Sequence, residues 1–389
     1  MHWINQYLTG RQQCVQVESA FSESLPVTIG VPQGSILAPL LFVLFVNDMP
    51  YCVKDPGLIN RVEYNNHESE IVLYADDSTL STSHTDPDTL QQNIQHDADL
   101  ATQWIRDNEL VCSGGKTKLL VIGTAVNRRF KLDRIDKVLS IQVCGKTVKE
   151  SSNEKLIGVI INNKGTWRDH LHGFNNEEEG IKESGLIKNL SKRVGLLRNM
   201  RKYLSDNKFN MICNGLFYSK LIYCLSVWGG MWNLPNVLDD NRRCNPTITL
   251  EDNRKLQVLQ NSVLRLKTGL CKETPVNTLL AEAKQLSVQQ LTAYHSVLSV
   301  YKCKQSTQPE YIYNRLFPTN HNVGNRNLRT IDLQEIRIEF RLSLSRSSFF
   351  YRASKLWNAL PLQAKVADTV RQFKKISKEW ITDNISPRP

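Results

Sequence analysis

The stretch Ile71-Val72-Leu73-Tyr74-Ala75-Asp76-Asp77-Ser78-Thr79-Leu80 decides how this chain is interpreted. Four apolar, β-prone residues lead into an acidic pair, and three further residues then resume an extended pattern. This order predicts a strand, a tight turn and a second strand, with Asp76 and Asp77 at the tip of the hairpin. Adjacent carboxylates repel each other, and a bound divalent cation would neutralise both. The alternative is a solvated Asp-Asp turn without a ligand, because a dipeptide is a weak motif.

A second motif, Gly30-Val31-Pro32-Gln33-Gly34-Ser35, lies upstream and precedes an apolar run over residues 36–46. Gly34 has no Cβ, so the backbone beside it can approach a ligand closely. Ser35 is the predicted N-cap of a helix in the apolar run. That run contains Pro39 and is shorter than a membrane span, so we expect it to be a helix buried in a core.

The two motifs together resemble a known family. Val31-Pro32-Gln33-Gly34-Ser35 and Tyr74-Ala75-Asp76-Asp77 look, in this order and separation, like the B and C motifs of reverse transcriptases. The residues around them are most similar to the polymerases of non-LTR, LINE-type or jockey-like retrotransposons, strongly over residues 10–125 and loosely elsewhere. The resemblance implies an α+β fold, with a partial palm of antiparallel sheet and helices, a helical thumb and a mainly helical C-terminal region. It also implies an RNA-directed DNA polymerase, which adds a dNTP to a DNA primer on an RNA template.

The resemblance assigns roles to individual residues. Asp76 and Asp77 would be catalytic and would hold two Mg²⁺ ions, with Mn²⁺ as an alternative. One ion would activate the primer 3′-hydroxyl and the other would hold the leaving pyrophosphate. The template and nucleotide pocket would be lined by Pro32, Gln33, Gly34, Tyr74 and Ala75.

A third carboxylate is expected from the family but is missing from the sequence. Two neighbouring carboxylates cannot bridge and orient two ions that each take an octahedron of oxygens. The family supplies another aspartate from a strand upstream of the position where Met1 stands, so we expect an N-terminally truncated palm. Such a chain is either part of a longer active product or an inactive remnant that binds RNA or DNA without polymerising. Asp48 is the nearest spare acid, although its Asn-Asp-Met-Pro setting favours a helix-end or turn role.

The segment Gly114-Gly115-Lys116-Thr117 imitates the end of a phosphate-binding P-loop. A P-loop requires a glycine five residues before Gly115, and Leu110 stands there, so ATP hydrolysis by that route is not expected. The segment instead resembles the family's D motif, in which Lys116 would be catalytic and would donate a proton to the pyrophosphate. The alternative is a solvated turn lysine.

A basic helix with an apolar stripe is predicted from residue 187 onward. The stripe is Ile187, Leu190, Val194 and Leu197. The basic residues interleaved with it are Lys188, Lys192, Arg193, Arg198, Arg201 and Lys202. Such a face suits a phosphate backbone, and the resemblance places the thumb here. The alternative is a solvated helix face.

The composition favours a nucleic-acid partner. A net charge of +11 and a pI of 9.2 fit a polyanionic ligand, and 41% hydrophobic residues fit a globular chain of 389 residues. Nine cysteines without paired spacing predict free thiols in a reducing compartment, and no zinc-ligand spacing occurs. Without a signal peptide or a spanning segment, we expect an intracellular protein with no membrane partner. The sequence does not specify the oligomeric state or distinguish nucleus from cytoplasm.

Four regions are predicted along the chain. They are a partial palm over 1–172, a thumb over 173–232, a linker over 233–248 and a C-terminal helical region over 249–389. Residues 155–161, with Trp167 and His170, resemble the family's primer-grip region, although Leu156 replaces an aromatic residue and Asn162 replaces an acid. Thr249 with Asp252 is expected to cap a helix beyond the linker. The motif Arg352-Ala353-x-x-Leu356-Trp357-x-x-Leu360-Pro361 resembles the tail that follows the polymerase in many non-LTR elements.

Overall fold

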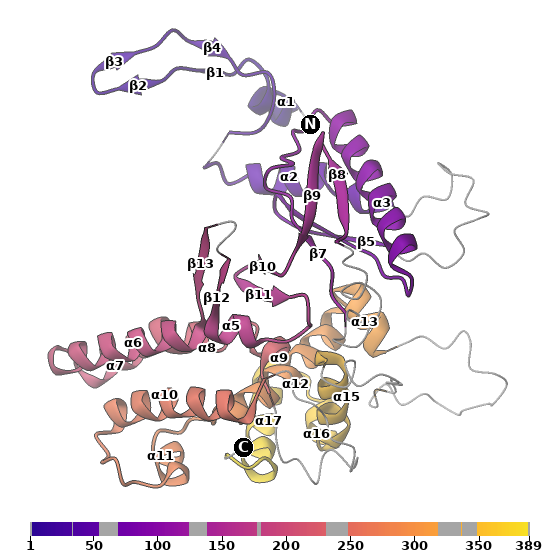
Figure 1. The fold of residues 1–389 in the computed structure, drawn as a ribbon. Coiled ribbons are helices and arrows are strands. Elements are labelled where there is room, and N and C mark those ends of the chain that lie inside the picture. Colours follow the sequence, from indigo (N-terminus) through magenta and orange to yellow (C-terminus); the bar gives the residue numbers. More distant parts are fainter. Residues whose placement is uncertain are drawn as a thin grey trace. The chain divides into compact units, whose positions relative to one another are not determined.

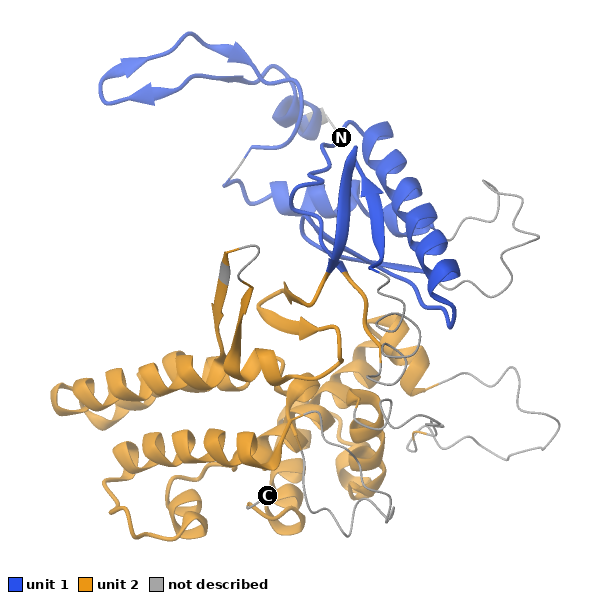
Figure 2. Cartoon of the chain, in the orientation of Figure 1, with its two compact units in different colours: residues 1–119, 127–150 blue, residues 120–126, 151–389 orange. Residues whose placement is uncertain are grey.

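The computed structural model of the protein describes residues 2–32, 34–53, 69–123, 138–176, 180–230, 248–317, 336 and 348–387. The chain forms two compact units (Figure 2). The first comprises residues 1–119 and 127–150, and the second comprises residues 120–126 and 151–389. Helices are combined with small antiparallel sheets, as expected for the predicted α+β class. None of the described helices combines the length and the apolar composition that a bilayer span requires.

The first unit is built on a long helix and short antiparallel strands (Figure 1). Its helical elements are α1 (His2–Leu8), α2 (Ala38–Phe45), the 3₁₀ turn η1 (Met49–Tyr51) and α3 (Pro87–Asp107). The paired strands are β1 (Gln12–Gln13) with β4 (Leu25–Pro26), β2 (Gln16–Val17) with β3 (Ala20–Phe21), and β5 (Glu70–Tyr74) with β6 (Asp77–Ser81). A three-stranded sheet has β9 (Lys146–Ser151) between β7 (Leu119–Leu120) and β8 (Ser140–Val143).

Helix α3 begins where the sequence provides a cap and a proline. The Asp86 side chain accepts a hydrogen bond from the Thr89 amide at 2.9 Å, and Pro87 occupies the first helical position. The helix is joined to β8 by two hydrogen bonds between Gln95 and Gln142, at 2.7 and 3.0 Å. These contacts hold α3 against the β8–β9 hairpin.

Helix α2 is more exposed than the sequence predicts. Among its residues only Ala38 is buried, whereas Leu40, Val43, Leu44 and Phe45 are exposed. The prediction of a helix buried in a core is therefore wrong for most of α2. The helix is apolar on every side, and among the described residues only one of its sides packs against the rest of the first unit.

The second unit contains two hairpins and a helical array. The hairpins are β10 (Asn153–Leu156) with β11 (Val159–Asn162), and β12 (Gly173–Asn176) with β13 (Ile181–Ser184). The helical elements up to residue 228 are α5 (Arg168–His172), α6 (Leu186–Met200), η4 (Arg201–Tyr203), α7 (Asp206–Cys213), the π-helical turn η5 (Asn214–Tyr218), α8 (Ser219–Leu221) and α9 (Leu225–Trp228). Those beyond it are α10 (Leu250–Thr268), α11 (Val276–Glu282), α12 (Val288–Ser306), α13 (Glu310–Leu316), α15 (Phe349–Ala359), α16 (Leu362–Lys365) and α17 (Val370–Asn384).

One hydrophobic core runs through the second unit, from Leu171 to Ile385. It includes side chains from both the predicted thumb and the predicted C-terminal region, such as Trp228 and Trp357. Buried Arg352 of α15 adds a polar connection, because its guanidinium donates to the Gly229 carbonyl at 2.7 Å. The compact units therefore divide the chain near residue 150 rather than at 172, and the segments 173–232 and 249–389 share one core. Nearly all of the predicted linker lies outside the described residues.

Helix α10 begins and ends as the sequence indicates. The Thr249 side chain accepts a hydrogen bond from the Asp252 amide at 3.1 Å, so the predicted cap is confirmed. Gly269 follows the helix with φ +73°, a left-handed conformation that glycine adopts without a steric penalty. His172 of α5 is hydrogen-bonded to the Asp252 carboxylate at 2.7 Å, which ties the start of α10 to α5.

Candidate active site

The acidic pair lies at the tip of the β5–β6 hairpin, with Asp76 on its two-residue turn and Asp77 as the first residue of β6. Tyr74 is paired with Asp77 across the hairpin, and Ala75 and Asp76 form the loop between them. The predicted strand, turn and strand are thus confirmed. Ala75 has φ +53°, in the left-handed region that costs a residue with a Cβ about 1 kcal/mol. The hairpin thus places both carboxylates at its tip.

The two carboxylates of the hairpin are exposed. Ile71 is 5% exposed and anchors β5 in the unit, whereas Tyr74, Asp76 and Asp77 are exposed. Within the described residues, neither carboxylate makes a hydrogen bond or an ion pair. Their charges are therefore available to a ligand.

The donor chemistry fits a hard divalent cation. Mg²⁺ in nucleotide sites is held by one or two carboxylates together with substrate phosphates and water, and Asp76 and Asp77 provide such a pair. In the part of the chain that the structure describes, no group of three or more His, Cys, Asp or Glu side chains could hold a metal. Asp48 is the N-cap residue of η1, which agrees with its predicted helix-end position. The described residues thus match the carboxylate-plus-phosphate mode without supplying a third carboxylate.

The upstream motif forms a turn before α2. Gln33 lies outside the described residues, Pro32 is half-buried, and Gly34 has φ +81° with open space around it. Ser35 is hydrogen-bonded to the Tyr7 hydroxyl, and its Oγ accepts from the Ala38 amide at 3.0 Å. The N-cap position itself belongs to Leu37, so the predicted N-cap is wrong by two residues. Ser35 instead fastens the motif to the first turn of α2 and to α1.

Lys116 lies on an exposed turn between α3 and β7. Its amide donates to the Ser113 carbonyl at 3.0 Å, and its side chain makes no hydrogen bond or ion pair within the described residues. Gly114 lies against the β8–β9 hairpin, where a Cβ would come within 2.7 Å of the Val143 carbonyl oxygen. The absence of a side chain at Gly114 therefore allows the turn to pack against the hairpin. No described contact joins Lys116 to the acidic pair.

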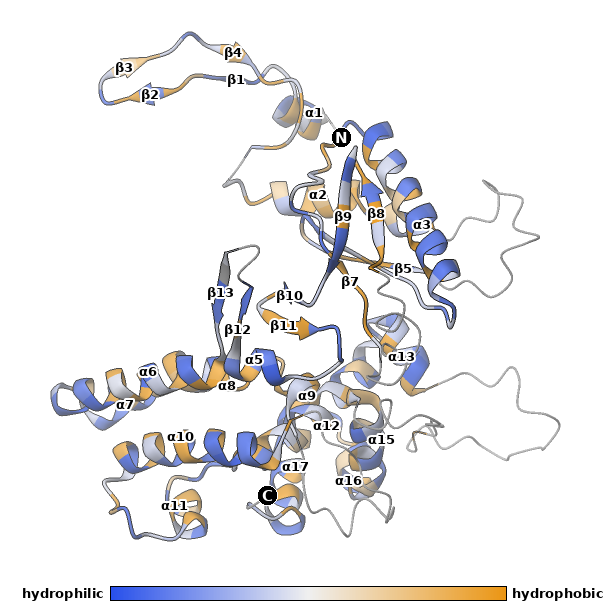
Figure 3. Ribbon diagram, in the orientation of Figure 1, coloured by the Kyte–Doolittle hydropathy of each residue, from blue (hydrophilic) through white to orange (hydrophobic). Residues whose placement is uncertain are grey.

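A cationic face follows the exposed side of α6 and continues into η4. We use this name for Lys188, Lys192, Arg198 and Lys202, all of which are exposed. At about 100° per residue, Lys188, Lys192 and Arg198 fall on the solvent side of α6, and Lys202 follows in η4. Buried Leu190, Val194 and Leu197 form the core side of α6, with Val194 one turn before Arg198. Hydrophobic and hydrophilic residues accordingly alternate along α6 (Figure 3). The predicted apolar stripe is confirmed at these three positions, and Ile187 is half-buried.

Residues 1–161 match the family model described as reverse transcriptase (RNA-dependent DNA polymerase), and this segment contains both the Asp76–Asp77 hairpin and the upstream motif. The match covers 161 of the 389 residues of the chain. The matched segment ends within β11 and thus reaches from the first unit into the second.

Curated relatives of the reverse transcriptase segment come from mobile elements. A probable RNA-directed DNA polymerase from transposon X-element of Drosophila melanogaster is 25% identical over 277 residues, which are 71% of this chain and 26% of that protein. The RNA-directed DNA polymerase from mobile element jockey of Drosophila funebris is 24% identical over 224 residues, 57% of this chain and 22% of that protein. The chain thus spans about a quarter of the length of these relatives. No solved structure matches significantly.

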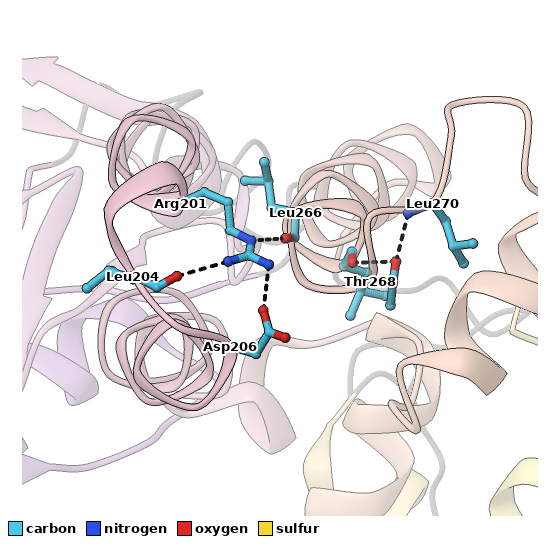
Figure 4. Close-up of polar contacts among 7 residues, drawn as sticks. Arg201, Leu204, Asp206, Leu266, Thr268 and Leu270 are labelled. Atoms are coloured by element: carbon cyan, nitrogen blue, oxygen red, sulfur yellow. Dashed lines mark hydrogen bonds and ion pairs between the residues drawn. The ribbon is translucent and has the colours of Figure 1, made fainter.

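Two of the six basic residues predicted to bind nucleic acid are committed to contacts inside the protein. Arg201 donates to the Leu266 carbonyl at 2.8 Å, to the Leu204 carbonyl at 3.1 Å and to the Asp206 carboxylate at 2.6 Å (Figure 4). Its guanidinium also lies 5.0 Å from the centre of the Phe209 ring. Arg193 donates to the Leu216 carbonyl. These arginines join α6 and η4 to α7, η5 and α10, a role that local sequence does not reveal.

The region that resembles a primer grip is the β10–β11 hairpin. Its turn, Ile157-Gly158, has positive φ at both residues, and the Tyr223 hydroxyl donates to the Ile157 carbonyl at 2.6 Å. Asn162, where the family has an acid, donates to Asp169 at 2.8 Å. Buried His170 accepts from the Ile160 amide at 3.4 Å, and burial, aided by Lys220, lowers its pKa to about 4. These contacts give the hairpin a rigid attachment to α5 and to the segment after α8.

Proposed function

We propose that this chain is the polymerase segment of a non-LTR retrotransposon reverse transcriptase. It extends a DNA primer on an RNA template, joining the α-phosphorus of a dNTP to the primer 3′-oxygen and releasing pyrophosphate. In this proposal the first unit with β10 and β11 is a partial palm, α6 and α7 belong to the thumb, and α10 to α17 support the thumb through the shared core. The proposal rests on one observation above all: an exposed carboxylate pair, without a partner among the described residues, at the tip of a hairpin inside the segment that matches the reverse transcriptase family.

In the proposed mechanism Asp76 and Asp77 would hold Mg²⁺. When bound, the metal would supply positive charge that makes the primer 3′-hydroxyl more acidic and stabilises the leaving pyrophosphate. The pair offers carboxylate oxygens without competition from any cation of the described chain, so its charge is free to act on these ligands. The strands on either side fix the turn, which limits the reorganisation needed when the substrate binds.

The remaining site residues position the substrate. Pro32, Gln33 and Gly34, with Tyr74 and Ala75, line the template–nucleotide pocket in this proposal. Gly34 supports this role because, beyond its chain neighbours, no described atom lies within 4 Å of the position that a Cβ would take. Lys116 is exposed on its turn, and in this proposal its ammonium group donates a proton to the oxygen of the leaving pyrophosphate.

The cationic face of α6 and η4 holds the template–primer duplex. Four exposed positive charges on one side of a helix suit a row of phosphates, and each contact releases a condensed counterion. In this proposal Arg193 and Arg201 do not contact the duplex. Their hydrogen bonds to the Leu216 and Leu266 carbonyls stabilise the packing of α6 and η4. The overall charge of +11 adds a favourable field for the approach of the polyanion.

Primer extension tests the proposed reaction. Purified chain is incubated with poly(rA)/oligo(dT), dTTP and either Mg²⁺ or Mn²⁺, and extended primers are resolved on a gel. Asp76→Asn and Asp77→Asn keep the side-chain shape but remove charge, so each should abolish incorporation. Asp383→Asn is the matched control, because Asp383 is an exposed aspartate of α17 without a described partner. Incorporation that survives both hairpin variants would refute the assignment of the site.

A second function is favoured by the count of carboxylates. Two adjacent carboxylates and no third metal-binding group among the described residues fit a protein that binds RNA or DNA without polymerising. In that case the chain extends no primer with either metal, while an RNA–DNA hybrid still binds with a salt dependence that the cationic face sets. Loss of binding on replacing Lys188, Lys192, Arg198 and Lys202 by alanine, combined with absent incorporation, would select this function.

A further inference from the structure

Two cysteines meet between the Lys116 turn and the β8–β9 hairpin. The Cys144 side chain lies close enough to Cys112 to interact with its thiol, although the two residues are far apart in sequence. Both cysteines are free and half-buried, and both belong to the first unit. The fold thus brings two partly exposed cysteines near each other.

The backbone at Cys144 indicates that this position is specified by more than turn formation. Cys144 and Gly145 form the two-residue turn between β8 and β9, with φ +50° and +75°. Asn, Asp and Gly are the residues that such a turn favours, and a cysteine at positive φ is strained there. The side chain of this strained residue interacts with Cys112.

A second contact fixes the two segments independently of the sulfurs. Gly114, two residues after Cys112, approaches the Val143 carbonyl so closely that a Cβ would lie 2.7 Å from its oxygen. The next residue, Gly115, lies near the Lys146 ammonium, which would be 3.2 Å from a Cβ at that position. Two residues that follow Cys112 thus lie against the residues on either side of the Cys144–Gly145 turn, so the fold holds the segments of the two cysteines together.

We propose that Cys112 and Cys144 form a reversible redox site, oxidised to an intrachain disulfide by small disulfides such as glutathione disulfide. The Cys144 thiolate attacks the small disulfide, forming a mixed disulfide and releasing one small thiol. The Cys112 sulfur then attacks the Cys144 sulfur, forming the intrachain bond and releasing the second thiol. The protein loses two electrons and two protons, and the small disulfide gains both.

The order of these steps follows from the surroundings of Cys112. Burial, and next the Cys144 thiol, raise the pKa of Cys112 to about 11, so little of it is thiolate near neutral pH. Cys112 is therefore the slow partner toward an external disulfide. It is suited to the second step, in which its target sulfur is already beside it.

The bond would tie the turn that carries Lys116 to the β8–β9 hairpin. Any effect of this tie on nucleotide addition rests on the proposed function, whereas the bond itself does not. The test below uses only the chemistry of the thiols, so failure of the polymerase proposal leaves its result unaffected.

Peptide mapping tests the site on the folded full-length chain. The protein is treated with glutathione disulfide, remaining thiols are blocked with N-ethylmaleimide in denaturant, and the chain is cut with trypsin without reductant. Trypsin releases residues 107–116 and 138–146, each with one cysteine. The proposal predicts one linked species of these peptides, two hydrogen atoms lighter than their sum, that disappears after dithiothreitol. Exposed Cys14 and Cys271 should instead carry glutathione.

Variants and a denatured control make the result decisive. Cys112→Ser and Cys144→Ser should each abolish the linked species and leave glutathione on the other cysteine. Cys52→Ser, which changes another half-buried cysteine of the first unit, should retain the linked species. Absence of the linked species from folded wild-type protein would overturn the proposal. An equal yield from protein unfolded in guanidinium would also overturn it, because the fold would then play no part in pairing the sulfurs.

Discussion

Replacing Arg201 should lower the stability of the protein without lowering its affinity for nucleic acid. The change Arg201→Ala removes donors to the carbonyls of Leu266 and Leu204 and to the carboxylate of Asp206. It also removes the cation that lies over the Phe209 ring. Three of the five N–H donors of the guanidinium are thus used inside the second unit, which disfavours a phosphate as its partner.

The size of the effect follows from these contacts. A hydrogen bond from a charged donor contributes about 1.5–3 kcal/mol, and two of them reach backbone carbonyls. The pair with Asp206, which is 77% exposed, adds about 1 kcal/mol at most, and the cation–π contact adds about 0.5–1 kcal/mol. Because Arg201 is 32% exposed, water can replace part of what is lost. We therefore expect Arg201→Ala to lower the free energy of unfolding by about 2–4 kcal/mol.

Arg198→Ala is the matched control, since Arg198 is an exposed member of the cationic face three residues earlier. It should change the free energy of unfolding by about 0.5 kcal/mol or less. It should lower the slope of log K against log salt by about 1, because one phosphate contact is lost. Guanidinium unfolding followed by circular dichroism gives the first quantity. Fluorescence anisotropy of a labelled RNA–DNA hybrid at several salt concentrations gives the second.

The opposite pattern would refute the reasoning. If Arg201→Ala leaves the unfolding midpoint unchanged and lowers the salt slope as much as Arg198→Ala, Arg201 contacts nucleic acid and its internal bonds contribute nothing. If neither variant alters the slope, the cationic face is a solvated surface and the thumb assignment fails.

Three further perturbations test the local structure. Gly114→Ala should destabilise the first unit by about 1–3 kcal/mol in thermal unfolding, because the added Cβ would lie 2.7 Å from the Val143 carbonyl oxygen. Gly195→Ala in α6, where a Cβ meets no described atom within 4 Å, should stabilise the protein by about 0.5–1 kcal/mol, and equal effects of the two variants would contradict the packing at Gly114. The closure of the Cys112–Cys144 bond from the mixed disulfide should speed up about tenfold per pH unit between pH 7 and 9, because the pKa of Cys112 is raised to about 11, and a flat profile by quenched mass spectrometry would contradict this. The pKa of His170 is lowered to about 4 in the folded protein, so the unfolded chain binds a proton at a higher pH, and the free energy of unfolding should fall by up to roughly 3 kcal/mol as the pH drops from 6.5 to 4. His170→Phe should lack this part of the pH dependence in urea unfolding, and identical profiles for the two proteins would contradict the role of His170.

Local patterns in the sequence predict several elements of this structure. The β-prone run before the acidic pair predicts the hairpin, because a strand period and a polar turn are both properties of neighbouring residues. Leu190, Val194 and Leu197 predict the buried side of α6 for the same reason. Thr249 with Asp252 predicts the start of α10, since a cap acts over three residues.

Contacts between distant residues were beyond sequence reasoning. Arg201 resembles a phosphate ligand until Leu266, sixty-five residues later, is seen to accept its hydrogen bond. The thiols of Cys112 and Cys144 have no diagnostic spacing, and only the packing of two turns brings them together. The burial of α2 was predicted from its apolar composition, but composition does not say whether another segment lies against it.

Metal binding at the hairpin tests the central claim most directly. Free Mn²⁺ is counted by electron paramagnetic resonance while the protein is titrated in the presence of dTTP, with free nucleotide as the blank. The wild-type chain and Asp383→Asn should bind Mn²⁺ beyond the blank, and Asp76→Asn and Asp77→Asn should lose that binding. If all four proteins take up the same amount of the ion, Asp76 and Asp77 are not metal ligands and the proposed active site is contradicted.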